Sequence, residues 1–177
     1  RQVKDAHELA TMREAGRRIS GVMAETLSGL RTGRRERDVA ADIDWAIRAA
    51  GFDGPAFETI VAGGPNTALP HARPGERRLA AGDLVLLDFG GVYDGYCVDL
   101  TRVAILGTPD PAALGWHEAV SEAHAAALAA EPVGGHRVIP PTPVTRTTTR
   151  VSNHMRMLEQ PTTSQTYLSR CAPNISS

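Results

Sequence analysis

The sequence predicts an α+β fold in which helices precede and follow one antiparallel hairpin. Two stretches near the N-terminus carry apolar side chains at helical spacing, and a third helix-like stretch begins at Asp110-Pro111. Between them, two apolar runs at about 83–93 and 96–106 are separated by Asp94-Gly95, as in a hairpin. Helices on both sides of an antiparallel hairpin favour α+β over a doubly wound parallel sheet.

Each predicted helix has a start or stop signal. The first is expected to begin after Asp5, because the residue three positions on is a glutamate and completes a capping box, and to end near 29–33. The second is expected over about 35–50, with Gly51 as its stop. The third is expected over 110–130, with proline in its first turn.

Three β-strands are expected between the second and third helices. The run at 57–62 is typical of a strand and is closed by Gly63-Gly64-Pro65. The hairpin strands follow, and Asp94-Gly95 is the dipeptide that a two-residue type I′ turn prefers, because both central residues need φ > 0.

The turn fixes the pairing of two aspartates. If 93 pairs with 96, Asp99 faces Gly90 and Asp88 faces Thr101, so Asp88 and Asp99 are diagonal neighbours on one face, about 7–8 Å apart at Cα. Glycine opposite Asp99 is expected to leave space between the carboxylates. Two carboxylates within apolar strands repel each other and are poorly solvated unless a cation lies between them. The pattern therefore predicts a divalent-metal site.

The same residues also allow an interpretation without a metal. An aspartate at a strand end is usually a solvated turn residue, and Asp99 could pair with Arg102 or with a helix end. Two carboxylates are too few ligands for most catalytic ions. The spacing alone leaves both interpretations open.

Two segments at their mutual spacing carry a family resemblance. They are 64–74, which reads Gly-Pro-Asn-Thr-Ala-Leu-Pro-His-Ala-Arg-Pro, and the hairpin segment 82–102. They resemble the substrate-side histidine segment and the metal-binding hairpin of the pita-bread metallopeptidases, which include methionine aminopeptidases, Xaa-Pro aminopeptidases and prolidases. Asn66, Pro70 and His71 are closer to the Xaa-Pro peptidases than to the His-Gly-Ile-Pro expected of a methionine aminopeptidase.

The resemblance implies a pita-bread (creatinase/aminopeptidase-like) fold, of which residues 1–130 form only the first, N-terminal half of the catalytic domain. It implies that Asp88 is the first carboxylate ligand, that Asp99 bridges two divalent ions, and that His71 is a catalytic residue that contacts the substrate. Manganese is the expected metal, with cobalt or zinc as alternatives. Taken by itself, without the resemblance, His71 is better interpreted as a loop histidine held by turn contacts beside Pro70.

Residues 131–177 differ from the rest in composition. They hold eight Thr and six Pro, no Lys, and no helical or alternating apolar pattern. Such a segment buries too little apolar surface to offset its ordering entropy, so we expect a low-order Thr/Pro/Ser/Arg-rich tail. A frame-shifted or replaced second half is a sharper hypothesis. The family's other ligands are a histidine in a glycine-rich strand and two glutamates; four tail residues lack that context and are not assigned, namely Glu131, His136, His154 and Glu159.

The net charge and the hydropathy of the sequence limit the partners that can be expected. A net charge of −1 gives no reason to expect nucleic acid or an anionic membrane as partner. No apolar run approaches a membrane span and the chain has no signal-like start, so a cytoplasmic location is expected. A homo-oligomer is left open.

The sequence therefore supports two functions of different class. The first is a metal-dependent aminopeptidase that removes an N-terminal residue preceding proline from an Xaa-Pro peptide, impaired in this chain by missing ligands. The alternative is a non-catalytic pita-bread-like binding module or an inactive truncated relative. The two differ in whether a complete ligand set is present.

Overall fold

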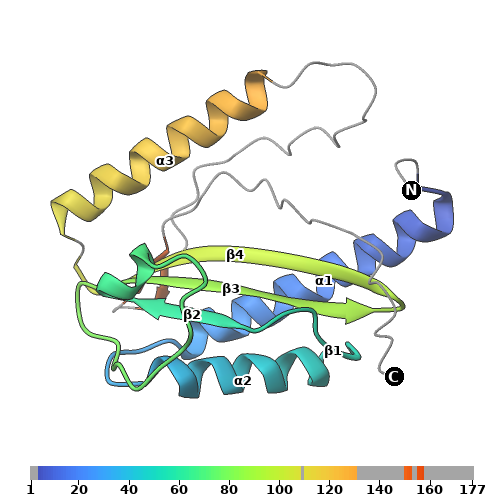
Figure 1. The fold of residues 1–177 in the computed structure, drawn as a ribbon, viewed down its shortest axis with the longest axis horizontal. Coiled ribbons are helices and arrows are strands. Elements are labelled where there is room, and N and C mark those ends of the chain that lie inside the picture. The colour runs from blue at the N-terminus through green and yellow to red at the C-terminus, as the bar shows by residue number, and fades with distance from the viewer. Residues whose placement is uncertain (1–3, 109, 131–149, 153–154, 158–177) are drawn as a thin grey trace.

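The computed structural model describes residues 4–108, 110–130, 150–152 and 155–157. It is an α+β structure in which two helices cover one face of an antiparallel sheet (Figure 1), which confirms the predicted fold class. The elements are α1 (Ala6–Gly29), α2 (Glu36–Ala49), β1 (Gly54–Pro55), β2 (Ile60–Gly63), the 3-10 helix η1 (Gly64–Ala68), β3 (Leu84–Tyr93), β4 (Tyr96–Leu106), α3 (Pro111–Ala130), β5 (Arg150–Ser152) and β6 (Met155–Met157).

The helix signals in the sequence act as predicted. Glu8 N donates to Asp5 Oδ1 over 2.9 Å, and Asp5 N donates to Glu8 Oε2 over 2.7 Å, so the capping box of α1 is complete. Helix α2 ends just before Gly51, whose φ of 86° is the left-handed conformation that glycine adopts readily. At α3, Ala112 N donates to Asp110 Oδ1 over 2.8 Å.

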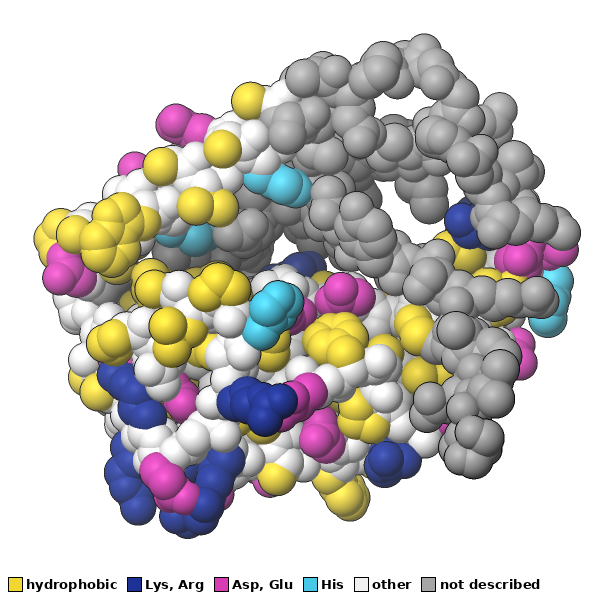
Figure 2. Space-filling view, viewed as in Figure 1, with side chains coloured by type: hydrophobic (Ala, Val, Ile, Leu, Met, Phe, Trp, Pro, Cys, Tyr) yellow, Lys and Arg dark blue, Asp and Glu magenta, His cyan; other side chains and the backbone are white. Residues whose placement is uncertain are grey.

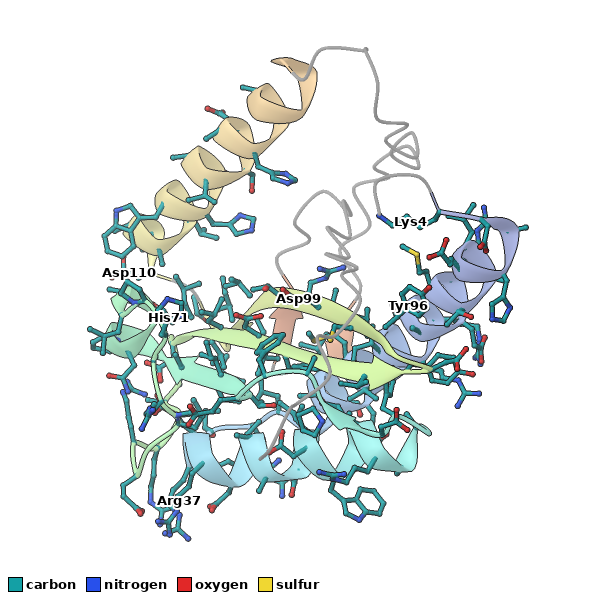
Figure 3. The ribbon with its side chains drawn as sticks, turned by 45° about the vertical axis from the view of Figure 1, so that its right-hand side comes forward. Lys4, Arg37, His71, Tyr96, Asp99 and Asp110 are labelled. Carbon is teal, nitrogen blue, oxygen red and sulfur yellow. The ribbon has the colours of Figure 1, made fainter. Side chains whose placement is uncertain are left out.

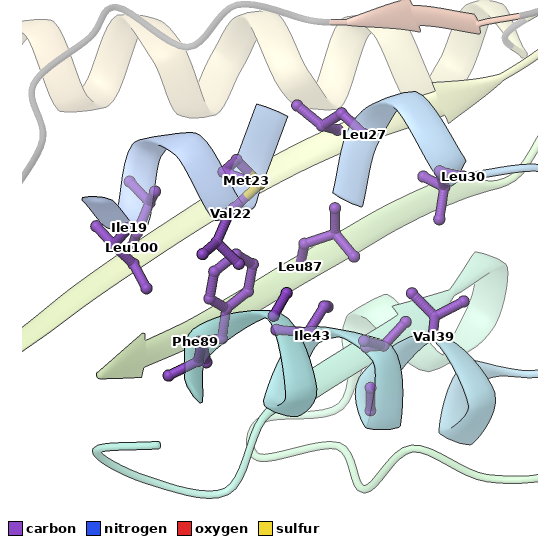
Figure 4. Close-up of a cluster of buried hydrophobic side chains, with 14 of the residues drawn as sticks. Ile19, Val22, Met23, Leu27, Leu30, Val39, Ile43, Leu87, Phe89 and Leu100 are labelled. Carbon is purple, nitrogen blue, oxygen red and sulfur yellow. The ribbon is translucent and has the colours of Figure 1, made fainter. Parts of the chain in front are cut away.

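The core lies between the sheet and the helices α1 and α2. In Figure 4, apolar side chains of both helices meet those of β3 and β4, and Leu87 and Phe89 of β3 have no exposed surface. Alternate residues of the two long strands point into this core: Val85, Leu87, Phe89, Val98 and Leu100. The residues between them lie on the opposite face of the sheet.

The region before β2 differs from the prediction. Strand β2 begins at Ile60 rather than at 57, and the short strand β1, which the sequence did not predict, pairs with β3. Thr59 is buried and its hydroxyl donates to Asp44 Oδ1 of α2 over 2.5 Å, while Ala56 N donates to the carbonyl of Gly90 over 3.0 Å. These contacts hold 56–59 against α2 and β3 instead of in a ladder.

Helix α3 lies on the side of the sheet opposite α2 (Figure 1). Strand β6 pairs with β4 and β5 pairs with β6, so residues 150–152 and 155–157 form two short strands that the sequence pattern did not predict. The remainder of 131–177 lies outside the described residues, and its predicted low order stays a prediction. Among the helices of the described part, none is long and apolar enough to cross a membrane.

Candidate metal centre

The β3–β4 hairpin has the register that the sequence predicts. Asp94 and Gly95 have φ of 49° and 75°, both positive as a type I′ turn requires. The paired residues are Tyr93 with Tyr96, Gly90 with Asp99 and Asp88 with Thr101. The register prediction is therefore confirmed at every position on which the site depends.

Asp88 and Asp99 consequently share a face of the sheet. Their chain neighbours Leu87, Phe89, Val98 and Leu100 are buried on the core side, which places both aspartates on the opposite face. Figure 3 shows Asp99 on the side of the sheet away from α2. Both aspartates are half-buried, and neither side chain takes part in the apolar core.

The electrostatics of the pair favour a cation. Burial of Asp99, followed by the charge of Asp88 and a side-chain hydrogen-bond contact with Asp88, raises the pKa of Asp99 to about 6. Among the described residues, Asp99 forms no salt bridge with Arg102, whose Nη1 donates instead to the carbonyl of Thr101 over 2.7 Å. The negative charge at Asp99 is therefore disfavoured until a proton or a cation compensates it.

Thr101 orients one of the two carboxylates. Its hydroxyl donates to Asp88 Oδ1 over 2.9 Å from the paired position on β4. This hydrogen bond fixes the rotation of the Asp88 carboxyl group. The sequence predicts that Thr101 faces Asp88 but does not by itself indicate the hydrogen bond. The signal that could have indicated it is a hydroxyl side chain directly opposite a candidate ligand.

The expected empty space beside Gly90 is not present. A Cβ atom at this position would collide with the carbonyl oxygen of Val98 and would lie 2.8 Å from Cε1 of Phe57. Glycine is therefore required by a close approach of backbone and ring, not by a vacancy between the carboxylates. Phe57, which the sequence placed in a strand, instead puts its ring edge beside the glycine that faces Asp99.

His71 lies on the loop that follows η1. Its side chain is exposed and its φ of 56° is left-handed, which is uncommon for a residue other than glycine. In Figure 3, His71 and Asp99 both lie on the side of the sheet away from α2, with His71 toward the η1 end. The structure thus places His71 over the same face as the two aspartates, and its contact with substrate stays a prediction.

The described residues fit part of a divalent-metal site. Hard cations bind carboxylate oxygens, and the raised pKa of Asp99 shows that no positive group among the described residues compensates the charge of the two aspartates. Within the described ranges, no group of three or more His, Cys, Asp or Glu side chains could hold an ion together. The unassigned residues of the tail lie outside those ranges, namely Glu131, His136, His154 and Glu159.

The chain is similar to known metallopeptidases in sequence and in fold. The model of metallopeptidase family M24 matches residues 10–136. The Xaa-Pro dipeptidase of Pyrococcus furiosus is 33% identical over 134 residues, which cover 76% of this chain and 38% of that protein. The X-Pro aminopeptidase structure from Thermotoga maritima is 36% identical with a TM-score of 0.69, covering 73% of this chain and 37% of that one. The dipeptidase PepE structure from Mycobacterium ulcerans is 41% identical with a TM-score of 0.67, covering 72% and 34%.

The fold, with two helices on one face of an antiparallel sheet, is thus that of a pita-bread metallopeptidase over the part of the chain that these comparisons cover. The chain belongs to metallopeptidase family M24. It spans less than two fifths of the length of these relatives.

Proposed function

We propose that this chain is the ligand-bearing first part of a metal-dependent aminopeptidase that removes an N-terminal residue preceding proline. The observation that carries the proposal is the hairpin register, which aligns Asp88 and Asp99 on one face of the sheet. Membership of family M24 and the names of the relatives, Xaa-Pro dipeptidase and X-Pro aminopeptidase, support the substrate class. Manganese is the proposed metal, with cobalt or zinc as alternatives.

Each residue of the site has a defined task in this proposal. Asp88 and Asp99 would hold divalent ions, which when bound lower the pKa of a water molecule and polarise the peptide carbonyl. Asp99, whose pKa is raised to about 6 by burial and by the charge of Asp88, would be held in its charged form by a bound cation. Thr101 keeps the Asp88 carboxyl in one orientation through its 2.9 Å hydrogen bond. His71 would contact the substrate from the loop above the same face.

The test is hydrolysis of an Xaa-Pro dipeptide with added Mn²⁺, compared with the same peptide carrying alanine in place of proline. Metal binding is measured in parallel by titration calorimetry on the chain and its Asp99→Ala variant. Asp94→Asn is a matched control, because it removes one carboxylate from the same hairpin at an exposed turn position. Loss of Mn²⁺ binding in Asp99→Ala but not in Asp94→Asn supports the site. Equal binding by all three proteins contradicts it.

The small number of metal-ligating side chains favours a second candidate function. The two aspartates are fewer than the ligands a catalytic ion needs, and the described residues supply no third to the pair. We therefore propose, as the alternative, a non-catalytic or impaired member of the family that binds metal weakly. Metal binding without proline-dependent turnover supports this alternative, and turnover that Asp99→Ala abolishes contradicts it.

A further inference from the structure

We infer that Glu36, the first residue of α2, is a positioning residue for His71. Its buried carboxylate joins the beginning and the end of the loop on which His71 lies. The inference rests on the proposed substrate contact of His71, but the contacts of Glu36 stand independently of it.

Glu36 is bound by three groups of that loop. Its Oε1 accepts from Gly63 N over 2.8 Å and from Asn66 Nδ2 over 2.9 Å. Its Oε2 accepts from Asn66 Nδ2 over 3.1 Å and from Gly75 N over 3.2 Å. One carboxylate therefore bridges the end of β2, the η1 turn and the returning chain, with His71 between the second and third of these contacts.

The burial of Glu36 is unexpected for a first-turn acid. An acidic side chain there is favourable near the helix N-terminus when it is exposed, and it needs no partners. Glu36 is only 1% exposed, and among the described residues no Lys or Arg forms a salt bridge with it. A buried carboxylate is costly unless hydrogen bonds compensate its lost hydration. Here the loop supplies that compensation, so the carboxylate and the loop conformation depend on each other.

The residues on either side of Glu36 behave differently. Arg35 and Arg37 both form ion pairs with Glu76 at the surface, Arg35 over 3.1 Å. Figure 2 shows Lys and Arg side chains gathered with acidic ones at one end of this face of the molecule, and Figure 3 places Arg37 at that end. Exposed pairs of this kind stabilise little. The buried contacts of the Glu36 carboxylate are thus a more specific link between α2 and the loop than these surface ion pairs.

The two ends of the loop differ in how they depend on Glu36. The returning chain is also docked on α2 by its backbone, since Glu36 N donates to Arg77 O over 3.0 Å and Arg37 N donates to Gly75 O over 3.2 Å. Asn66 Nδ2 has both oxygens of Glu36 as its acceptors. Loss of the carboxylate should therefore loosen η1 more than the returning chain. A loosened η1 would in turn release the left-handed backbone at His71.

The experiment compares Glu36→Gln with Val39→Ala by amide hydrogen exchange. Glutamine keeps the shape of the side chain but has one acceptor oxygen, so its amide group would face N–H donors that now lack an acceptor. Val39 is equally buried on α2 but bonds nothing in the loop, and its truncation serves as the control for a general loss of stability. We expect exchange at 63–69 to rise at least tenfold in Glu36→Gln relative to Val39→Ala, with a smaller rise at Gly75.

Two further variants keep the test decisive if Glu36→Gln folds poorly. Asn66→Ala removes only the η1 contact and is expected to give a smaller rise at the same amides. Asn66→Asp added to Glu36→Gln restores a donor–acceptor pair with reversed roles and is expected to recover part of the protection. Exchange in Glu36→Gln and Asn66→Ala no faster than in Val39→Ala would overturn the inference.

Failure of the proposed function would look different. His71→Ala and Glu36→Gln are also assayed for Xaa-Pro hydrolysis in the Mn²⁺-loaded protein, together with the kcat and KM of each. A faster-exchanging loop in Glu36→Gln with unchanged hydrolysis in His71→Ala would remove the substrate role of His71 while the loop contact of Glu36 stands. A matching rise of KM in both variants supports the inference as a whole.

Discussion

Replacing Asp99 with asparagine is expected to stabilise the metal-free chain at neutral pH while it removes metal binding. The pKa of Asp99 is raised from its usual 3.8 to about 6 by burial and by the neighbouring Asp88 carboxylate. Since one pKa unit corresponds to about 1.36 kcal/mol, the charged form costs at most about 3 kcal/mol. Asp99 is only half-buried and solvent screens part of the repulsion, so we expect about 1–1.5 kcal/mol.

The pH dependence gives the sign of this effect. Between about pH 4 and 6 the native chain holds a proton on Asp99 that the unfolded chain has lost. The contribution of Asp99 to the free energy of unfolding therefore falls as pH rises through that window and stays low above it. Asparagine does not titrate, so the difference between Asp99→Asn and the parent chain isolates this group from the other carboxylates.

Urea unfolding at pH 4, 5, 6 and 7.5 measures the effect, with Asp94→Asn as the control on the same hairpin. The stability gain of Asp99→Asn should grow from pH 4 to pH 7 and then level off. Saturating Mn²⁺ at about one hundred times its Kd should add about 2.7 kcal/mol to the parent chain and nothing to the variant. A variant that is no more stable than the parent at pH 7.5 without metal would refute the argument that the acidic pair is strained by its own charge.

Three other substitutions test the packing around the site. Gly90→Ala should destabilise the fold by about 1–3 kcal/mol in urea unfolding, because its Cβ meets the Val98 carbonyl and the Phe57 ring; a neutral result would show that this approach is loose. Thr101→Val should lower stability by about 1 kcal/mol and weaken Mn²⁺ binding by about tenfold in calorimetry, since it removes the hydrogen bond to Asp88 Oδ1; unchanged affinity would exclude an orienting role. Phe89→Ala should lower the free energy of unfolding by about 3–5 kcal/mol and leave the Mn²⁺ affinity of the folded protein unchanged, because Phe89 lies on the core face. A loss of Mn²⁺ affinity in the folded variant would contradict the separation of the core face from the face that carries the aspartates.

The parts of the fold that were predicted correctly depend on local signals. The capping glutamate of α1, the glycine after α2 and the Asp94-Gly95 turn each act within a few residues. The turn fixes the register of the two strands, and the alternation of side chains along each strand then fixes the face on which Asp88 and Asp99 lie. The shared face of Asp88 and Asp99 could thus be predicted from the sequence, because it depends only on one turn and on the two-residue period of side chains in a strand.

The features that were missed depend on contacts between distant segments. Thr59 leaves the strand pattern because its hydroxyl bonds Asp44 of α2, and Phe57 turns toward Gly90 on β3. Glu36 has the pattern of an ordinary first-turn acid, and nothing near it in sequence indicates that Gly63, Asn66 and Gly75 will enclose it. Such roles become visible only when the chain has folded back on itself.

The two faces of the hairpin have opposite effects on the stability of the same two strands. On the core side, Leu87 and Phe89 gain stability by complete burial, and this burial fixes the register. That register holds Asp88 and Asp99 on the other face, where burial and mutual repulsion raise the pKa of Asp99 and lower stability. A sequence selected for folding alone would place a neutral residue at position 99. The metal proposed for this face would compensate that charge, and the burial of Leu87 and Phe89 offsets the cost of holding the two carboxylates together.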